Sequence, residues 1–101
     1  METLKFYVSE GQHHEGVLLY EWLLETARRL DIPGGTAFRA LAGYGRHGRL
    51  HEEMFFELGG ELPVVVEFVL EAPQTGRLLD ELRPHGLDLR YVRQASESGI
   101  V

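Results

Sequence analysis

Three glycines and two arginines lie within seven residues, in the segment Gly43–Arg49. Glycine lets backbone N–H groups come close to a ligand, and an arginine guanidinium binds phosphate oxygens through two parallel hydrogen bonds. The segment is therefore a candidate phosphate-binding loop. A glycine-rich connection with solvated charges would show the same pattern. A P-loop is excluded because no Gly-Lys-Ser or Gly-Lys-Thr follows, and no helix begins here as a dinucleotide-binding motif requires.

Histidine gives the second candidate site, in two pairs: His13 with His14, and His47 with His51. Neutral imidazoles bind zinc, copper or nickel, and two histidines four residues apart face the same way on a helix. We expect the segment that holds His47 and His51 to be loop or strand, where this geometry is lost. A metal site at His47 and His51 and a pair of solvated loop histidines both remain open.

Glutamates give the third candidate, and their spacing fixes no catalytic pair. They are scattered along the second half of the chain, at Glu52, Glu53, Glu57 and Glu67. No two of them are held at a separation that acid–base chemistry uses, and no Ser-His-Asp pattern is visible. We therefore predict that the protein is not an enzyme.

Hydropathy predicts the elements that position these residues. Alternation of apolar and polar residues indicates strands, and apolar residues at helical spacing indicate helices. We expect strands over Thr3–Ser9, Thr36–Tyr44, Leu62–Leu70 and Leu87–Arg93. We expect one helix from about Glu15 to Leu30, after the first strand, and a second from Glu71 to before Pro84, after the third strand. The order is therefore strand, helix, strand, strand, helix, strand. Residues 52–58 are also strand-like. This order predicts an α+β fold of the ferredoxin-like βαββαβ plan, a four-stranded antiparallel sheet with two helices on one face.

Two predicted surfaces are more apolar than a monomer needs. Trp22 lies beside the apolar stripe of the first helix and widens it, so we expect a subunit contact over this flank. The stripe itself comprises Val17, Tyr20, Leu23, Leu24, Ala27 and Leu30. On the sheet, outward residues such as Tyr7, Leu41 and Val65 are too apolar for a solvent-facing surface. These residues predict oligomerisation through the sheet.

Several segments carry a resemblance to known signalling proteins. Gly43–His47 is similar to the Gly-Phe-Gly-Arg-Gln segment that opens the T-loop of P-II proteins, and Glu53–Leu70 is similar to the strand pair that follows that loop. Nearly the whole chain resembles an uncharacterised P-II-like family, through Leu4–Val8, Leu19–Glu21, Gly43–Gly45, Arg49–His51 and Leu62–Glu67. Some members of that family are associated with fluoride-exporting membrane proteins. The resemblance thus implies a membrane transporter or channel as one candidate partner.

The resemblance also implies a ligand and a set of binding residues. P-II proteins are homotrimers that bind adenine nucleotides in clefts between subunits and signal through the T-loop. The expected effector is therefore ATP, ADP or AMP, with or without a divalent metal. By position, His47 matches a glutamine that touches ligand and metal in P-II proteins. The predicted ligand-binding set is Gly43, Gly45, Arg46, His47, Arg49, Arg90 and Arg93.

Two departures from the P-II pattern keep other functions open. Pro73–Arg77 lacks the P-II phosphate-binding loop pattern, and no tyrosine lies between Gly48 and Phe56 as a modification site. One alternative is a divalent-metal-binding protein similar to the CutA family, which would use His47 and His51. Another alternative is an interaction module that binds no ligand.

Composition limits the partners and the compartment. The chain has 101 residues and a formal net charge of −6, which argues against nucleic-acid binding. The absence of cysteine excludes disulfides and thiolate metal sites. No apolar run approaches the roughly 20 residues of a membrane span, so we predict a cytoplasmic protein. We expect one domain over residues 1–93, with a mobile loop at about 45–56 and a polar tail over 94–101.

Overall fold

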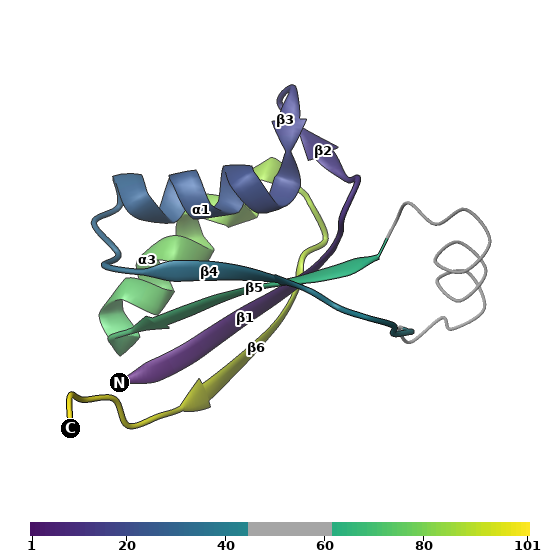
Figure 1. Ribbon diagram of the computed structural model, residues 1–101. Coiled ribbons are helices and arrows are strands. Elements are labelled where there is room, and N and C mark those ends of the chain that lie inside the picture. The colour runs from purple at the N-terminus through teal and green to yellow at the C-terminus, as the bar shows by residue number, and fades with distance from the viewer. Residues whose placement is uncertain (45–61) are drawn as a thin grey trace.

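The structure, a computed structural model, describes residues 1–44 and 62–101. Its elements are β1 (Glu2–Ser9), β2 (His13–His14), β3 (Val17–Leu18), α1 (Leu19–Arg29), β4 (Gly35–Arg39), β5 (Pro63–Leu70), α3 (Ala72–Leu82), the 3-10 turn η2 (Arg83–His85) and β6 (Arg90–Ala95). Four strands form an antiparallel sheet in the order β4–β5–β1–β6, and β2 pairs with β3 (Figure 1). The predicted α+β fold with a four-stranded antiparallel sheet and two helices is confirmed.

The core lies between the sheet and its helices. Alternate residues of the two central strands, such as Phe6 on β1 and Phe68 on β5, are buried on the helix side. The Phe6 and Phe68 rings meet edge to face, with centroids 6.2 Å apart, a favoured aromatic geometry. The helices complete this core with Leu19, Leu23 and Ala27 from α1 and with Leu78, Leu79 and Leu82 from α3.

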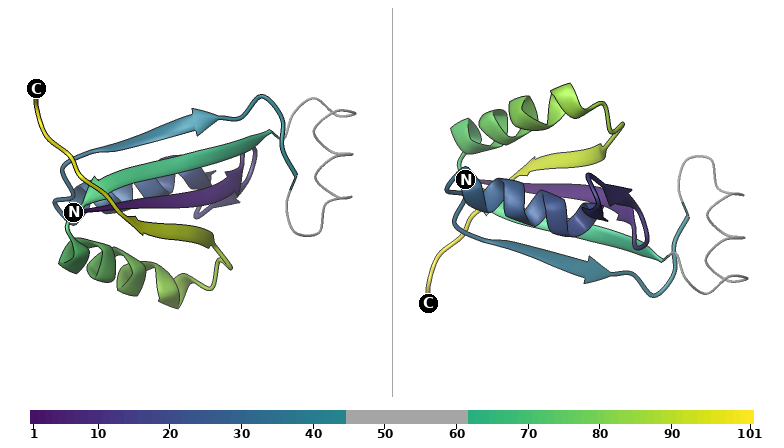
Figure 2. Two further views of the ribbon diagram at one scale, coloured as in Figure 1. Left: turned by 90° about the horizontal axis from the view of Figure 1, so that it is seen from below. Right: turned by 90° about the horizontal axis from the view of Figure 1, so that it is seen from above.

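The opposite face of the sheet has no helix over it in the described part of the chain (Figure 2). Strand register places one row of side chains across this face, from Phe38 on β4 through Val65 on β5 to Tyr7 on β1. Phe38 is 51% exposed and Tyr7 is 40% exposed. We call this surface the outer sheet face; its apolar residues are Tyr7, Phe38, Val65, Val69 and Val92.

The first helix begins at Leu19, later than the predicted start at about Glu15. Val17 and Leu18 pair with the preceding histidines as a short strand instead of joining the helix. The turn between these strands has positive φ angles, which a right-handed helix does not allow. The buried stripe of α1 is shifted accordingly and consists of Leu19, Trp22, Leu23, Thr26 and Ala27.

Two strand boundaries also differ from those predicted. β4 ends at Arg39, although the Ala40 N–H still donates to the Pro63 carbonyl at 2.8 Å. β6 begins at Arg90 and continues to Ala95, because Ala95 pairs with Glu2 of β1. The predicted strand-like segment at 52–58 and the predicted mobile loop at about 45–56 lie outside the described residues.

Candidate functional site

A tight hairpin of β2 and β3 positions the first two side chains of the candidate site. His14 pairs with Val17, and Glu15 and Gly16 form the turn with φ angles of 52° and 84°. Two positive φ angles are typical of a type I′ turn, in which the second position is usually glycine. Glu15 is a non-glycine residue in the left-handed region, a conformation that costs about 1–3 kcal/mol. The turn thus holds Glu15 in a strained backbone conformation and places its carboxylate beside His14.

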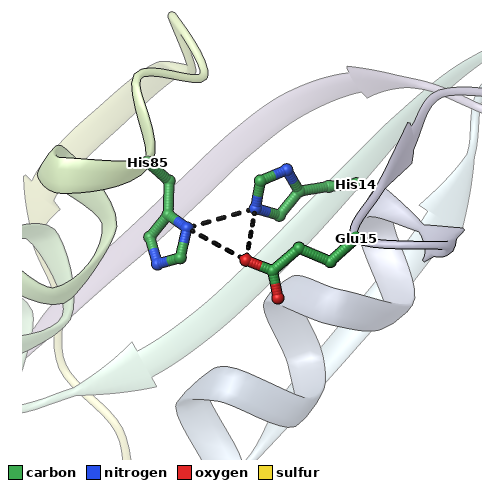
Figure 3. A group of neighbouring side chains, drawn as sticks. All are labelled: His14, Glu15 and His85. Atoms are coloured by element: carbon green, nitrogen blue, oxygen red, sulfur yellow. Dashed lines mark hydrogen bonds and ion pairs between the residues drawn. The ribbon is translucent and has the colours of Figure 1, made fainter.

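The third side chain comes from the far end of the chain. η2 follows α3 and carries His85, and Gly86 ends the turn with a left-handed φ of 60°. His14 and His85 are separated by 71 positions in the sequence, so only the tertiary fold brings them together. Figure 3 shows the side chains of His14, Glu15 and His85 pointing toward one another from the hairpin and from η2.

The three side chains present their polar atoms in a nearly equilateral triangle. His14 Nε2 lies 3.1 Å from His85 Nδ1. The Glu15 Oε2 atom lies 3.3 Å from His14 Nε2 and 3.5 Å from His85 Nδ1. The side chains of His14 and His85 are 17% and 28% exposed, whereas that of Glu15 is 57% exposed. The imidazoles are therefore largely shielded from solvent, whereas the carboxylate side of the triangle is exposed to solvent.

Trp22 packs against both imidazole rings. Its ring centroid lies 4.5 Å from that of His14 and 4.7 Å from that of His85, and both pairs meet edge to face. Trp22 is only 8% exposed as a result. The flank of α1 that we expected a second subunit to cover is covered here by the chain's own histidines. We call the group of His14, Glu15, Trp22 and His85 the histidine corner.

The polar atoms of the histidine corner are nitrogens and oxygens of the kind that bind metal ions. His14 Nε2 and His85 Nδ1 form a hydrogen bond only when one nitrogen carries the hydrogen and the other accepts it. The accepting nitrogen directs its lone pair toward the other ring, and the Glu15 carboxylate oxygens offer further lone pairs. Imidazole nitrogen and carboxylate oxygen are both ligands of divalent transition metals. The same atoms could instead serve as a polar contact between the hairpin and η2.

The residues predicted to bind a nucleotide fall mainly in the undescribed part of the chain. Positions 45–61 include the loop residues Gly45, Arg46, His47 and Arg49, together with the predicted metal ligand His51. Gly43 is described and lies against the stem of β5, where a side chain would place its Cβ 3.3 Å from Pro63 Cγ. The backbone at Gly43 thus runs close to the start of β5.

The two predicted arginines of the last strand lie on opposite faces of the sheet. Arg90 is opposite Tyr7 and so belongs to the outer sheet face. Arg93 is opposite Leu4, on the helix side, and its Nε donates to Glu2 Oε1 at 2.8 Å. This hydrogen bond holds the pKa of the Glu2 carboxyl below its usual value. The structure therefore does not bring Arg90 and Arg93 to one site within a single chain.

Sequence reasoning identified one of the three polar residues of the histidine corner as a candidate ligand. The pair His13 and His14 stood out as candidate metal ligands, and the structure places His14 in the corner and His13 on the exposed side of the hairpin. His85 carried no signal, because nothing in its local sequence indicates proximity to residue 14. Glu15 was assigned to a helix start, and its role depends on the hairpin turn.

A family model matches most of the chain. The family is DUF190, described as "Uncharacterized ACR", and the match spans residues 1–89. The chain belongs to this family. The resemblance to an uncharacterised family drawn from the sequence is thereby confirmed.

Relatives of this DUF190 chain occur in bacteria and archaea. A UPF0166 protein of Aquifex aeolicus is 39% identical over 82 residues, which covers 81% of this chain and 78% of the relative. A UPF0166 protein of Methanocaldococcus jannaschii is 35% identical over 81 residues, which covers 80% of this chain and 74% of the relative. Neither name states an activity.

Solved structures confirm the PII-like fold of the DUF190 chain. CPII of Thiomonas intermedia K12, described as a nitrogen regulatory PII-like protein, matches with a TM-score of 0.59 at 22% identity and covers 92% of this chain and 82% of CPII. That CPII structure holds ADP, AMP and bicarbonate. A second CPII structure, bound to ADP and bicarbonate, has the same TM-score and covers 91% of this chain and 79% of CPII. At this identity the match shows the fold alone.

None of the described helices has the length and apolar composition needed to cross a membrane.

Proposed function

We propose that the protein is a P-II-like regulator: a homotrimer that binds an adenine nucleotide at the clefts between subunits and signals through the loop after β4. The observation that carries the proposal is the outer sheet face. Phe38 and Tyr7 are 51% and 40% exposed on a sheet whose two central strands bury their other face against the helices. An antiparallel sheet with an apolar uncovered face is stable when another surface covers it. Further copies of the chain are the cover that the P-II resemblance implies.

One predicted phosphate-binding residue, Arg90, lies at the end of this face where the chain on both sides of the segment 45–61 meets the sheet. The two stems of the segment 45–61, meaning the chain just before it and just after it, are held at the sheet by hydrogen bonds. The Ala40 N–H donates to the Pro63 carbonyl and the Glu10 N–H donates to the Leu62 carbonyl, each at 2.8 Å. Arg90 lies in the same row as Tyr7 and Val65, close to these stems. A guanidinium at this place is suited to an anion held between the loop and a neighbouring copy.

The identity of the nucleotide is proposed from the fold and the loop motif. CPII shares the fold, and its structures hold ADP, AMP and bicarbonate. The loop of this chain offers glycines and the arginines Arg46 and Arg49, groups that bind phosphate. ADP or AMP is therefore the effector that we test first, with ATP beside them.

Isothermal titration calorimetry of the full chain with ADP, AMP and ATP tests the proposal. We expect saturable binding of at least one nucleotide. Arg46→Ala and Arg90→Ala each remove a charge-assisted hydrogen bond, typically about 1.5–3 kcal/mol, so the dissociation constant should rise about tenfold or more. Arg28→Ala is the matched control, since Arg28 pairs with Glu25 on α1 away from the sheet face.

Two results would contradict the proposal. If none of the three nucleotides binds, an interaction module that holds no ligand becomes the better interpretation. If a nucleotide binds with equal affinity to the wild type and to both arginine variants, the site lies elsewhere on the chain. A metal response that disappears in a His47→Ala, His51→Ala double variant would instead favour the CutA-like alternative.

A further inference from the structure

We propose that His14, Glu15 and His85 form a binding site for a divalent transition-metal ion, with zinc as the ion that suits the donor set. Two imidazole nitrogens and one carboxylate oxygen are a known combination of zinc ligands, in which a fourth position is left for water or another group. The site lies in the corner between the β2–β3 hairpin and η2 (Figure 3), and none of its three ligands belongs to the residues predicted to bind the nucleotide.

The spacing of the donor atoms fits one face of a tetrahedron. Zinc binds nitrogen and oxygen at about 2.0–2.1 Å, so neighbouring ligands in a tetrahedral site are about 3.3–3.4 Å apart. The three donor separations in the histidine corner are 3.1, 3.3 and 3.5 Å. A single ion can thus reach all three atoms with little movement of the side chains.

The surroundings of the triangle support an ion rather than a solvated cluster. Trp22 packs edge to face on both imidazoles and restricts their rotation. The exposed Glu15 carboxylate leaves a path from solvent and contributes the negative charge that offsets a cation. The strained φ of 52° at Glu15 keeps this carboxylate beside the two rings. The donors are therefore held together before any ion binds.

The donor set also predicts selectivity. Imidazole nitrogen suits zinc, copper and nickel, whereas magnesium and calcium require oxygen ligands in larger number. One carboxylate among two imidazoles offers too few oxygens for either of these cations. Zinc should therefore bind in an excess of magnesium.

Titration of the metal-free full chain with zinc chloride, in the absence of nucleotide, tests the site. Trp22 is the only tryptophan of the chain, so its fluorescence reports on the corner directly. We expect a saturable fluorescence change and a rise in melting temperature. At about a hundredfold excess over the dissociation constant, this rise should be on the order of ten degrees. Magnesium chloride under the same conditions should produce neither change.

Variants assign the effect to the three ligands. His85→Ala should weaken zinc binding at least about a hundredfold, and Glu15→Gln at least about tenfold. Glu15→Gln keeps the size of an exposed side chain, so it tests the site even if His85→Ala is poorly folded. The matched control is His13→Ala, from the other side of the same hairpin, which should bind zinc like the wild type.

Three results would overturn the proposal. The first is no saturable response to zinc, in which case the three side chains form only a hydrogen-bonded contact between the hairpin and η2. The second is unchanged zinc affinity in both His85→Ala and Glu15→Gln. The third is loss of zinc binding in the His47→Ala, His51→Ala variant alone. Because no nucleotide is present, none of these results decides the proposed regulatory function.

Discussion

The outer sheet face and the histidine corner both contain aromatic side chains, but they differ in what covers them. In the corner, Trp22 is 8% exposed because two histidines of the same chain pack on its ring. On the outer sheet face, Phe38 and Tyr7 remain 51% and 40% exposed because no described element of the chain lies over them. The corner is therefore complete within one chain, whereas the outer sheet face is left for the further copies of the proposed homotrimer. Metal binding should therefore affect the histidine corner, and subunit assembly should bury the outer sheet face.

The largest effect should come from a charge placed on the outer sheet face. Tyr7→Glu puts a carboxylate at the centre of the proposed subunit contact, where burial of an unpaired charge is strongly unfavourable. We expect the variant to be monomeric by light scattering and to lose nucleotide binding. Its free energy of unfolding as a monomer should change by about 1 kcal/mol or less, because Tyr7 is already 40% exposed.

Val17→Glu is the matched control for that charge. Val17 is 44% exposed on the hairpin, away from the outer sheet face. It should leave the oligomeric state unchanged. A Tyr7→Glu protein with the same mass as the wild type would show that this face is not the contact.

A second large effect should follow from truncation in the histidine corner. Trp22→Ala removes a buried indole from the core of α1 and from both imidazoles, and substitutions of this kind cost about 3–5 kcal/mol. Urea denaturation at fixed protein concentration measures this loss. A loss below about 1 kcal/mol would mean that the indole contributes little to the core.

A smaller effect of opposite sign should come from the hairpin turn. Asparagine adopts the left-handed conformation more readily than glutamate, so Glu15→Asn should raise the free energy of unfolding by about 1 kcal/mol without metal. The same substitution should weaken zinc binding, because it removes the carboxylate. Urea denaturation in EDTA, followed by zinc titration, measures both effects. If Glu15→Asn were less stable than the wild type in EDTA, the backbone conformation of Glu15 would not be a source of strain.

The smallest effect should be the pH response of the Glu2–Arg93 pair. The hydrogen bond from Arg93 lowers the pKa of Glu2 from an ordinary value of 4.5, so the pair stabilises the fold above that pH. This contribution is lost as the pH falls below 4.5 toward the lowered folded-state value. Urea denaturation at pH 7 and at pH 3 should show a smaller loss of stability for Glu2→Gln than for the wild type. Equal losses of stability in Glu2→Gln and in the wild type would show that the Glu2–Arg93 pair does not stabilise the fold.

Elements with one strong periodicity were predictable from the sequence. The alternation in β1 predicted that strand and its buried face, the apolar run predicted the central strand β5, and Pro63 and Pro73 marked element starts. The helix start was wrong because Val17 continues the helical spacing of α1 while pairing as a strand with His14. A two-residue strand carries too few positions for any periodicity to show.

The candidate sites were predictable only in part. His14 was recognised as a candidate ligand from its neighbour His13, but its partners Glu15 and His85 depend on a turn conformation and on a contact across 71 positions. Alternation along β6 places Arg90 and Arg93 on opposite faces of the sheet, as their register with Tyr7 and Leu4 of β1 shows. The loop residues Gly45, Arg46, His47 and Arg49 lie outside the described residues and stay predictions.

Sedimentation equilibrium of the full chain, first in EDTA and then with zinc, tests the difference between the two regions most directly. The proposed homotrimer, assembled through the outer sheet face, predicts a mass of three times the 11.5 kDa chain in EDTA, because assembly needs no metal. The histidine corner predicts the same mass after zinc is added, because its three ligands come from one chain. A monomer in EDTA, or a trimer that forms only with zinc, would contradict this account.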